Sequence, residues 1–293
     1  MTGSWHHGRL DWISVLIGEV HAMLIMVRGG GDLGTGTGHR LHRVGWNVVV
    51  TELPEPLVIR RSVAFASAIY EGHIVVDGVE ARLASEPAEV RSLLGQGIVP
   101  VCPDPDGELI SALQPDVVVD ARLAKRSLDT RMGDAPIVIG LGPGFEAGRD
   151  VHVVIETMRG HHLGRIIYQG GAAANTQVPG LVMGQGRDRV LRAPCAGRFA
   201  GHVSIGDQIE ARQTVADVDQ QAVRAKIPGV LRGIIHDGVI VREGQKVGDI
   251  DPRGVREHCF TISDKARAVG GSVLEAILYL QRHLTGNGGS AKL

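Results

Sequence analysis

The 293-residue chain has few cysteines, almost no net charge and no long hydrophobic run. Its cysteines, Cys102, Cys195 and Cys259, lie far apart, which excludes a disulfide framework or a cysteine-based metal site. They favour a reducing cytoplasm. The formal net charge of −1 offers no electrostatic footprint for nucleic acid or for an anionic membrane surface. Because no run reaches 18 apolar residues, we expect a soluble cytoplasmic protein without nucleic-acid or membrane partners.

From Met23 onward, short apolar runs alternate with helical patterns, and residues 1–22 are set aside as an N-terminal extension. Continuous runs such as DVVVDA suit strands that are covered on both faces, as in a parallel sheet between two layers of helices. We therefore predict a Rossmann-like α/β domain over residues 23–175. Its strands are expected at Leu24–Arg28, Trp46–Glu52, His73–Val76, Ile98–Cys102, Val117–Asp120 and Ile137–Gly140, with a further edge pair at His152–Met158 and Arg165–Gln169. Helices are expected at Thr35–Val44, Leu57–Tyr70, Pro87–Leu94 and Glu108–Leu113.

After the Gly-Ala-Asn stretch 170–176 the composition changes, and the chain repeats itself at an interval of 32 residues. The repeat predicts two interlocked half-units in a small β barrel-sandwich hybrid domain over residues 180–253, resembling biotinyl and lipoyl carrier domains. Carriers need a lysine where the halves join, but this joint reads Asp219–Ala222. We therefore expect no covalent biotin or lipoate, and a role in docking or stability.

The chain returns to a helical pattern after the repeat. Ser272 and Glu275 match the S-x-x-E capping box, so we predict a helix that begins there and packs on the first domain. This C-terminal helical segment covers residues 254–285, and residues 286–293 form a tail.

A glycine cluster follows the first strand, at the expected start of a helix. Glycines in the pattern G-x-G-x-x-G permit a tight turn, close approach of a phosphate and close packing of helix on strand. An acidic residue about 20 positions later can accept hydrogen bonds from ribose. Gly36 and Gly38 suggest an unusually close ligand; alternatively, the glycines serve packing alone. The candidate cofactor-binding residues here are Gly29, Gly30, Gly31, Asp32, Gly34 and Glu52.

Two further stretches follow predicted strands and are candidates for the same ligand. DARLAK places Asp120, Arg122 and Lys125 at a strand's carboxyl end, where open α/β sheets bind ligands. GLGPGFEAGRD contains Gly142 and Gly144, whose turn leaves amides free for a ligand or merely reverses the chain.

A polar stretch at Glu156–Arg165 is a third candidate. Adjacent histidines on a strand point to opposite faces, so we expect no metal site. One imidazole beside an acid and an arginine suits anion binding or proton transfer, although a solvated corner explains the pattern equally well. The residues concerned are Glu156, Arg159, His161 and His162. No motif pairs a nucleophile with its base, so catalytic residues are unknown and enzyme activity stays open.

Several long segments together resemble one family. They are RGGGDLGTG, RRSVAFASAIYEG, GLGPGFEAGRDVHVVIETMRGHHLGR, KVGDIDPR and FTISDKARAVGGSVLEAIL. The chain resembles, over almost all of residues 23–284, the selenium-dependent molybdenum hydroxylase system proteins of the YqeB type. The resemblance implies an accessory factor in the maturation of molybdenum hydroxylases related to xanthine dehydrogenase.

Three functions are therefore compared. The first is a maturation factor that binds a phosphate-bearing nucleotide or the molybdenum cofactor, with a molybdenum hydroxylase as client. The second is an NAD-dependent oxidoreductase, and the third is a non-catalytic scaffold. A homo-oligomer is compatible with each of them.

Overall fold

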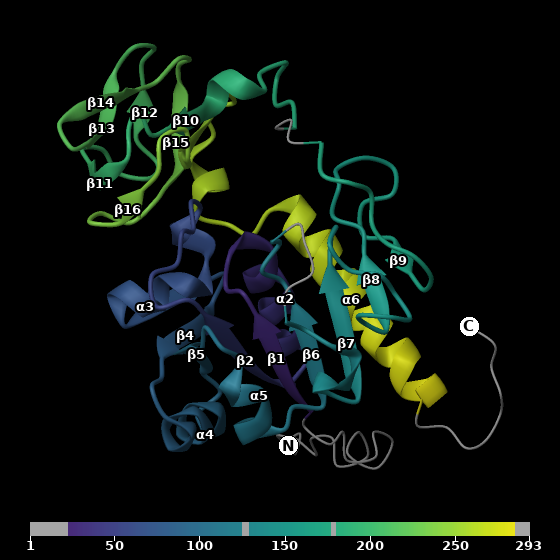
Figure 1. The fold of residues 1–293 in the computed structure, drawn as a ribbon. Coiled ribbons are helices and arrows are strands. Elements are labelled where there is room, and N and C mark those ends of the chain that lie inside the picture. The colour runs from purple at the N-terminus through teal and green to yellow at the C-terminus, as the bar shows by residue number, and fades with distance from the viewer. Residues whose placement is uncertain (1–22, 125–128, 177–179, 285–293) are drawn as a thin grey trace, which may run out of the picture.

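The computed structural model describes residues 23–124, 129–176 and 180–284. A nine-stranded sheet in the order β3-β4-β5-β2-β1-β6-β7-β8-β9 forms the larger part, and two four-stranded sheets form a smaller β module (Figure 1). The strands of the large sheet are β1 (Leu24–Arg28), β2 (Asn47–Glu52), β3 (His73–Val76), β4 (Val79–Leu83), β5 (Val99–Pro103), β6 (Val117–Asp120), β7 (Ile137–Leu141), β8 (Val153–Ile155) and β9 (Ile166–Ile167). Its α-helices are α2 (Asp32–Arg43), α3 (Ala68–Glu71), α4 (Pro87–Gly95), α5 (Glu108–Leu113) and the C-terminal α6 (Asp264–Leu284).

The large sheet is mixed, so the predicted Rossmann-like parallel sheet is wrong as a fold class. Strands β4 to β8 pair in parallel along the centre, but β3 pairs antiparallel with β4 and β9 antiparallel with β8. The hairpin β3–β4 turns at Asp77 and Gly78, both with positive φ. Because β4 was not predicted, the sequence pattern suggested a helical crossover after β3 in place of this hairpin.

Helices cover both faces of the sheet. Apolar side chains of β1 pack alternately, since successive residues of a strand point to opposite faces. Ile25 and Val27 join the core that contains α2 and α6, whereas Met26 packs in the cluster of Val118, Val138 and residues of α5. Helices α4 and α5 cover that second face.

The β module consists of two antiparallel sheets, β10-β17-β15-β12 and β14-β13-β11-β16. Its strands are β10 (Val190–Arg192), β11 (Gly197–Gly201), β12 (Gln208–Ile209), β13 (Thr214–Val218), β14 (Gln221–Arg224), β15 (Gly229–Ile234), β16 (Ile240–Val241) and β17 (Lys246–Asp251). Each sheet takes two strands from each half of the 32-residue repeat, and the strands enclose one apolar core around Phe199, Val215 and Leu231.

The segment between β2 and β3, which contacts the β module, was predicted as a helix over Leu57–Tyr70, and this prediction is largely wrong. It contains two 3-10 turns, Arg61–Val63 and Phe65–Ser67, and only the short α3 at its end. Ile59 and Tyr70 pack against the core of the β module, and Tyr70 stacks on His236 with ring centroids 4.1 Å apart. Val63, Phe65 and Ala68 of the same segment pack in the core of the large sheet, so its apolar residues serve both parts of the molecule and do not form one helical face.

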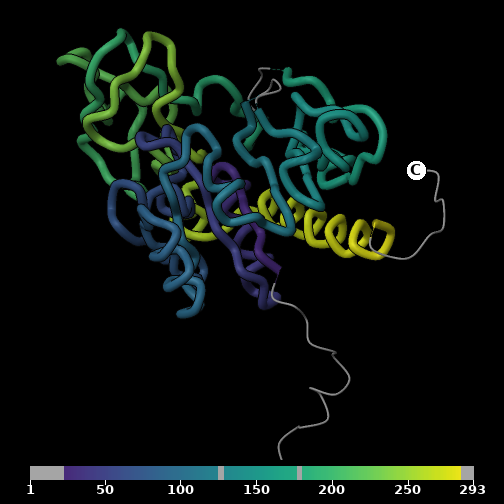
Figure 2. Tube along the Cα trace, turned by 60° about the horizontal axis from the view of Figure 1, so that its bottom comes forward, coloured from purple at the N-terminus to yellow at the C-terminus, as the bar shows by residue number. Residues whose placement is uncertain are grey.

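Helix α6 begins beside the β module and runs away from it along the large sheet (Figure 2). Its buried residues belong to the core of the sheet, which confirms that the C-terminal helix packs on the first domain. The predicted start at Ser272 is wrong. Ser263 caps the helix, because its hydroxyl accepts from the Ala266 amide at 3.1 Å, whereas Ser272 lies mid-helix and donates to the carbonyl of Ala268.

Candidate functional site

A crevice of about 780 Å³ opens at the carboxyl ends of β1, β2 and β6. In the sheet order, β1 has β2 on one side and β6 on the other. The strands that follow β2 add on its side of β1, and the strands that follow β6 add on the opposite side, so the strand order reverses at β1. Such switch points of open α/β sheets form ligand crevices. The lining includes Gly29, Gly31–Leu33, Thr51–Leu53, Leu57, Val58, Asp104, Ala121–Ala124, Asp129 and Lys265.

Three of the four loop glycines are required by packing within the protein. A Cβ on Gly29 would lie 2.9 Å from the Arg122 nitrogen, one on Gly30 2.8 Å from the Ala66 nitrogen, and one on Gly34 would overlap the Gly29 carbonyl. A Cβ on Gly31 would meet only a methyl group of Val58 at 3.7 Å. Gly31 is therefore the one position of the four at which the missing side chain leaves space in the crevice.

Gly31 is also the N-cap residue of α2. The first N–H groups of a helix have no partner inside the helix. Within the part of the chain that the structure describes, the amides of Asp32 and Leu33 find no acceptor, and the first intrahelical bond runs from Thr35 to the Gly31 carbonyl at 2.8 Å. This helix end suits an anionic group, since the amides point outward and the helix dipole favours negative charge.

The carboxylate of Asp32 does not oppose an anion here. It accepts from Nη1 of Arg60 at 2.7 Å, and this Arg60 side chain is only 10% exposed. The pairing neutralises the Asp32 carboxylate, which would otherwise repel a phosphate bound at this glycine loop.

Glu52 lies in the crevice as predicted from its position at the end of β2. Its Oε2 accepts from the Gly30 amide at 2.9 Å and its Oε1 from the Leu53 amide at 2.8 Å. Burial raises the pKa of this carboxyl, while the two amide bonds lower it. Each oxygen retains a lone pair, so Glu52 holds the loop and can also accept from a ligand hydroxyl or amine.

Asp120 and Arg122 belong to a bonded network at the end of β6. Asp120 is 1% exposed and accepts from Arg122 and from the hydroxyl of Thr130, and Arg122 also donates to Asp129 at 2.6 Å. Arg28, 2% exposed, donates to Thr130 and Asp129. Burial raises the pKa of Asp129, but the hydrogen bonds from Arg28 and Arg122 hold it at about 2.

This network changes the predicted role of the DARLAK segment. Arg122 borders the crevice, but each of its three nitrogens already donates to Asp120, Asp129 or Thr130, so it fixes the edge of the crevice more than it offers an anion partner. Lys125, predicted at the same rim, lies outside the described residues.

Sequence reasoning missed Lys265, the second residue of α6, which lines the crevice together with residues of the DARLAK segment. Burial lowers the pKa of its ammonium, and the nearby Arg159 lowers it further. The signal that would have found it is the helix start at Ser263, 9 residues ahead of the capping box that the sequence suggested.

The second glycine loop does not line the crevice. Gly142 has φ +74°, and a Cβ there would lie 2.6 Å from the Thr157 hydroxyl; its amide donates to Ile155. Gly144 follows with φ +115°. Both glycines therefore reverse the chain, so that Phe145 packs in the apolar cluster beneath β7.

The polar stretch after β8 is placed mainly by structural bonds. Glu156 is buried and accepts from the amides of Met158 and Ala173, and Arg159 pairs with Asp264 at 2.6 Å. His161 and His162 are exposed, with ring centroids 5.0 Å apart in an edge-to-face arrangement. His162 and Glu156 border a separate surface hollow of about 590 Å³.

The extra glycines of α2 allow close packing against neighbouring elements and do not indicate a close ligand. A Cβ on Gly36 would lie 2.6 Å from the Cβ of Ala266 in α6, and Gly38 faces Val48 and Phe65. The inference of an unusually close ligand from these two glycines is therefore wrong.

Across residues 23–124, 129–176 and 180–284, no three His, Cys, Asp or Glu side chains gather in a way that could hold a metal ion. The same ranges contain no helix long and apolar enough to cross a membrane.

Fold and site together define a protein with an α/β domain that carries a ligand-sized crevice and a two-sheet β module docked beside it. No family profile matches the chain. It is 47% identical over 257 residues to a protein of Escherichia coli K12 described as uncharacterized protein YqeB, an alignment that spans 88% of this chain. The chain is thus similar to YqeB over most of its own length. The chain spans about half the length of that relative, 48%.

Solved structures similar to the chain include an aspartoacylase family protein of Mesorhizobium loti, 10% identical, with a TM-score of 0.27 over 78% of this chain and 85% of the other. A succinylglutamate desuccinylase of a Silicibacter species is 13% identical, with a TM-score of 0.23 over 78% and 84%. TM-scores this low assign neither a shared fold nor an activity.

These findings correct several descriptions drawn from the sequence. The fold class drawn from the sequence is corrected by the large mixed sheet, which replaces the predicted Rossmann-like parallel sheet. The similar structures named above are described as aspartoacylase and desuccinylase proteins, and nothing in them supports the predicted barrel-sandwich hybrid, biotinyl/lipoyl-like domain. The labels Rossmann-like, nucleotide-binding, selenium-dependent and molybdenum hydroxylase maturation likewise find no support in the relatives.

Proposed function

We propose that the protein binds a small phosphate-bearing molecule in the crevice at the carboxyl ends of β1, β2 and β6. One observation carries the proposal: the Asp32 and Leu33 amides lack acceptors among the described residues and lie at the crevice, where Gly31 leaves room. An oriented helix end of this kind stabilises an anion without any rearrangement.

Different lining residues favour different parts of such a ligand. Lys265 supplies positive charge near the start of α2, which suits the phosphate. Glu52 and Asp104 also line the crevice, and both are acceptors. A ligand that presents hydroxyl or amine donors there would complete their hydrogen bonding. The ligand class is thus a phosphate joined to a donor-rich group.

The role implied by the family resemblance stays a prediction. The structure of the described residues does not test an accessory function, a molybdenum hydroxylase client docked by the β module, or the molybdenum cofactor as ligand. An NAD-dependent oxidoreductase and a non-catalytic scaffold also stay untested. A change in nicotinamide absorbance with a candidate substrate would be needed for the oxidoreductase.

The test is calorimetric titration of the full chain with NAD, NADP, ATP, CTP and isolated molybdenum cofactor. The proposal expects saturable binding of at least one compound, and loss of that binding when Gly31 is replaced by valine. Binding of none of them, or binding that Gly31→Val leaves unchanged, would remove the basis of the proposal.

A further inference from the structure

Three carboxylates, each paired with its own arginine, lie where the β module meets the starts of α2 and α6. Arg60 donates to Asp32 at 2.7 Å. Arg159 donates through two nitrogens to Asp264, at 2.6 and 2.7 Å. Arg253 likewise takes both oxygens of Asp251, at 2.9 and 2.6 Å. These three ion pairs leave no carboxylate oxygen of Asp251 or Asp264 without a close cationic donor.

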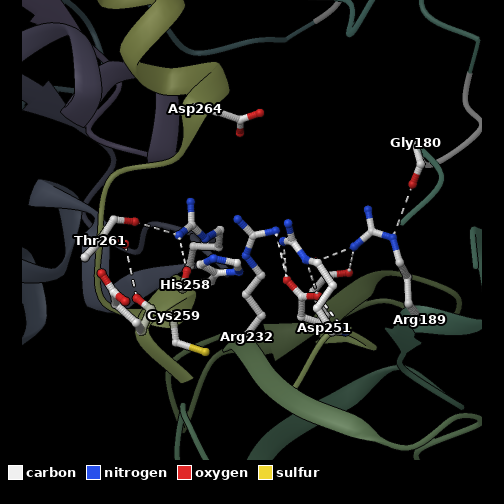
Figure 3. A network of polar contacts seen from close by, with 12 residues as sticks. Gly180, Arg189, Arg232, Asp251, His258, Cys259, Thr261 and Asp264 are labelled. Carbon is white, nitrogen blue, oxygen red and sulfur yellow. Dashed lines mark hydrogen bonds and ion pairs between the residues drawn. The ribbon is translucent and has the colours of Figure 1, made fainter. Parts of the chain in front are cut away.

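Arg232, on β15, is a fourth arginine of this junction and lacks a partner of its own. Its side chain is 13% exposed, and the nearest carboxylate oxygen is Oδ2 of Asp251 at 3.5 Å, already bonded to Arg253. Its Nε is buried without a hydrogen-bond acceptor. Figure 3 shows Arg232 rising from the module between His258 and Asp251, toward the side on which Asp264 lies.

Lys265 is the second cation, and carboxylates act on its ammonium only from beyond ion-pair distance. It follows Asp264 directly at the start of α6 and is half-buried. Across the described residues its ammonium forms no ion pair, while the neighbouring Asp264 is taken by Arg159. Arg232 and Lys265 both lie within electrostatic range of Asp32 and Asp264.

The charges of the junction therefore do not balance. Among the described residues, three carboxylates serve five cations, a difference of two positive charges. Around them, Asp249 pairs with both Arg189 and Lys246 and so adds one positive charge, while Glu156, which accepts only from amides, adds one negative charge. The difference of two is therefore unchanged. Burial lowers the pKa of Arg232, and the charge of Arg60 lowers it further. A desolvated cation without a partner is costly, and a bound anion removes that cost.

We propose that Arg232 and Lys265 form a binding site for a phosphate-type dianion between the β module and the start of α6. Two uncompensated positive charges match the charge of a phosphate, and guanidinium and ammonium are its usual protein ligands. Lys265 also lines the crevice, so a dianion held by both residues would bring Arg232 of the β module to the edge of the crevice ligand. Only this last identification, of the dianion as part of the crevice ligand, rests on the proposed function.

The test titrates inorganic phosphate into the full chain by calorimetry. Arg232→Gln and Lys265→Gln are compared with Arg224→Gln and Lys226→Gln, which change the same residue types at exposed positions of the β module. Each of the first pair should weaken phosphate binding at least tenfold, and each of the second pair by less than twofold. No binding by the unaltered chain at millimolar phosphate, or equal binding by all variants, would overturn the site.

Thermal unfolding gives a second readout that does not depend on calorimetric heats. Without phosphate, Arg232→Gln should unfold at a higher temperature than the unaltered chain, because the unpaired charge is gone. With phosphate, the unaltered chain should gain stability and the variant should not. A lower unfolding temperature for the variant in both conditions would contradict the unpaired charge.

Failure of this site and failure of the proposed function leave different signatures. If nucleotides do not bind but phosphate binding depends on Arg232 and Lys265, the site stands and the proposed function falls. If Gly31→Val loses nucleotide binding while the affinity for phosphate is unchanged in Arg232→Gln and Lys265→Gln, the site falls and the proposed function stands.

Discussion

Gly36 and Gly270 face each other where α2 crosses α6, so closely that a Cβ on Gly270 would lie 2.7 Å from the Gly36 carbonyl oxygen. The contact fixes the beginning of α6, and with it Lys265, against the helix whose N-terminus opens into the crevice. Helix packing thus sets the geometry of the site.

Gly270→Val should therefore lower the free energy of unfolding by about 1–3 kcal/mol, because overpacking at a backbone contact forces the helices apart. Urea unfolding measures the loss. Gly271→Val, at the next position where a Cβ meets nothing within 4 Å, is the matched control and should leave stability unchanged or raise it by less than about 1 kcal/mol, because valine has a higher helix propensity than glycine. Equal losses in both variants would contradict the close crossing.

The strands of the large sheet could be predicted because each is a buried apolar run, and β1 and β6 begin and end where the sequence placed them. Long-range packing could not. The apolar residues of Leu57–Tyr70 pack partly on the β module, and nothing in their spacing distinguishes that from covering a sheet. Gly36 likewise carries no sign in the sequence that its partner is Ala266, 230 positions later.

The candidate site shows the same division. Glu52 and the glycine loop follow from local order, strand then turn then helix, which the sequence displays. Lys265 depends on where α6 begins, and the S-x-x-E pattern at Ser272 occurs inside the helix, so a local motif pointed to the wrong start. The bonded state of Arg122 depends on Asp129, which approaches it through the tertiary fold.

Asp120→Asn should destabilise the fold by about 3 kcal/mol, since the buried carboxylate that pairs with Arg122 loses its charge and Asp129 is left as the one counter-charge for both Arg28 and Arg122 among the described residues. Asp116→Asn is the control: Asp116 is exposed and accepts only from the Leu24 amide, so its loss should be about 1 kcal/mol. Chemical denaturation of both variants decides the point, and similar losses would mean that the Asp120 network contributes little.

Acid should remove the stabilisation that Asp129 provides. Its pKa in the folded chain is about 2, below the ordinary value of 3.8, so this contribution is present above pH 3.8 and is lost as the pH falls toward 2. Unfolding followed between pH 5 and pH 2, in about half-unit steps, should show a smaller decline for Asp129→Asn than for the unaltered chain. Parallel declines would show that Asp129 is not held ionised by Arg28 and Arg122.

The most direct measurement is the affinity of Gly31→Ala for whichever phosphate compound binds the unaltered chain, with Gly95→Ala as control. Both glycines have room for a Cβ and neither has a positive φ, but only Gly31 lies in the crevice. The account predicts that Gly31→Ala stays folded and binds at least tenfold more weakly, a change of about 1.4 kcal/mol, while Gly95→Ala binds normally. Unchanged affinity in folded Gly31→Ala would contradict an anion at the start of α2.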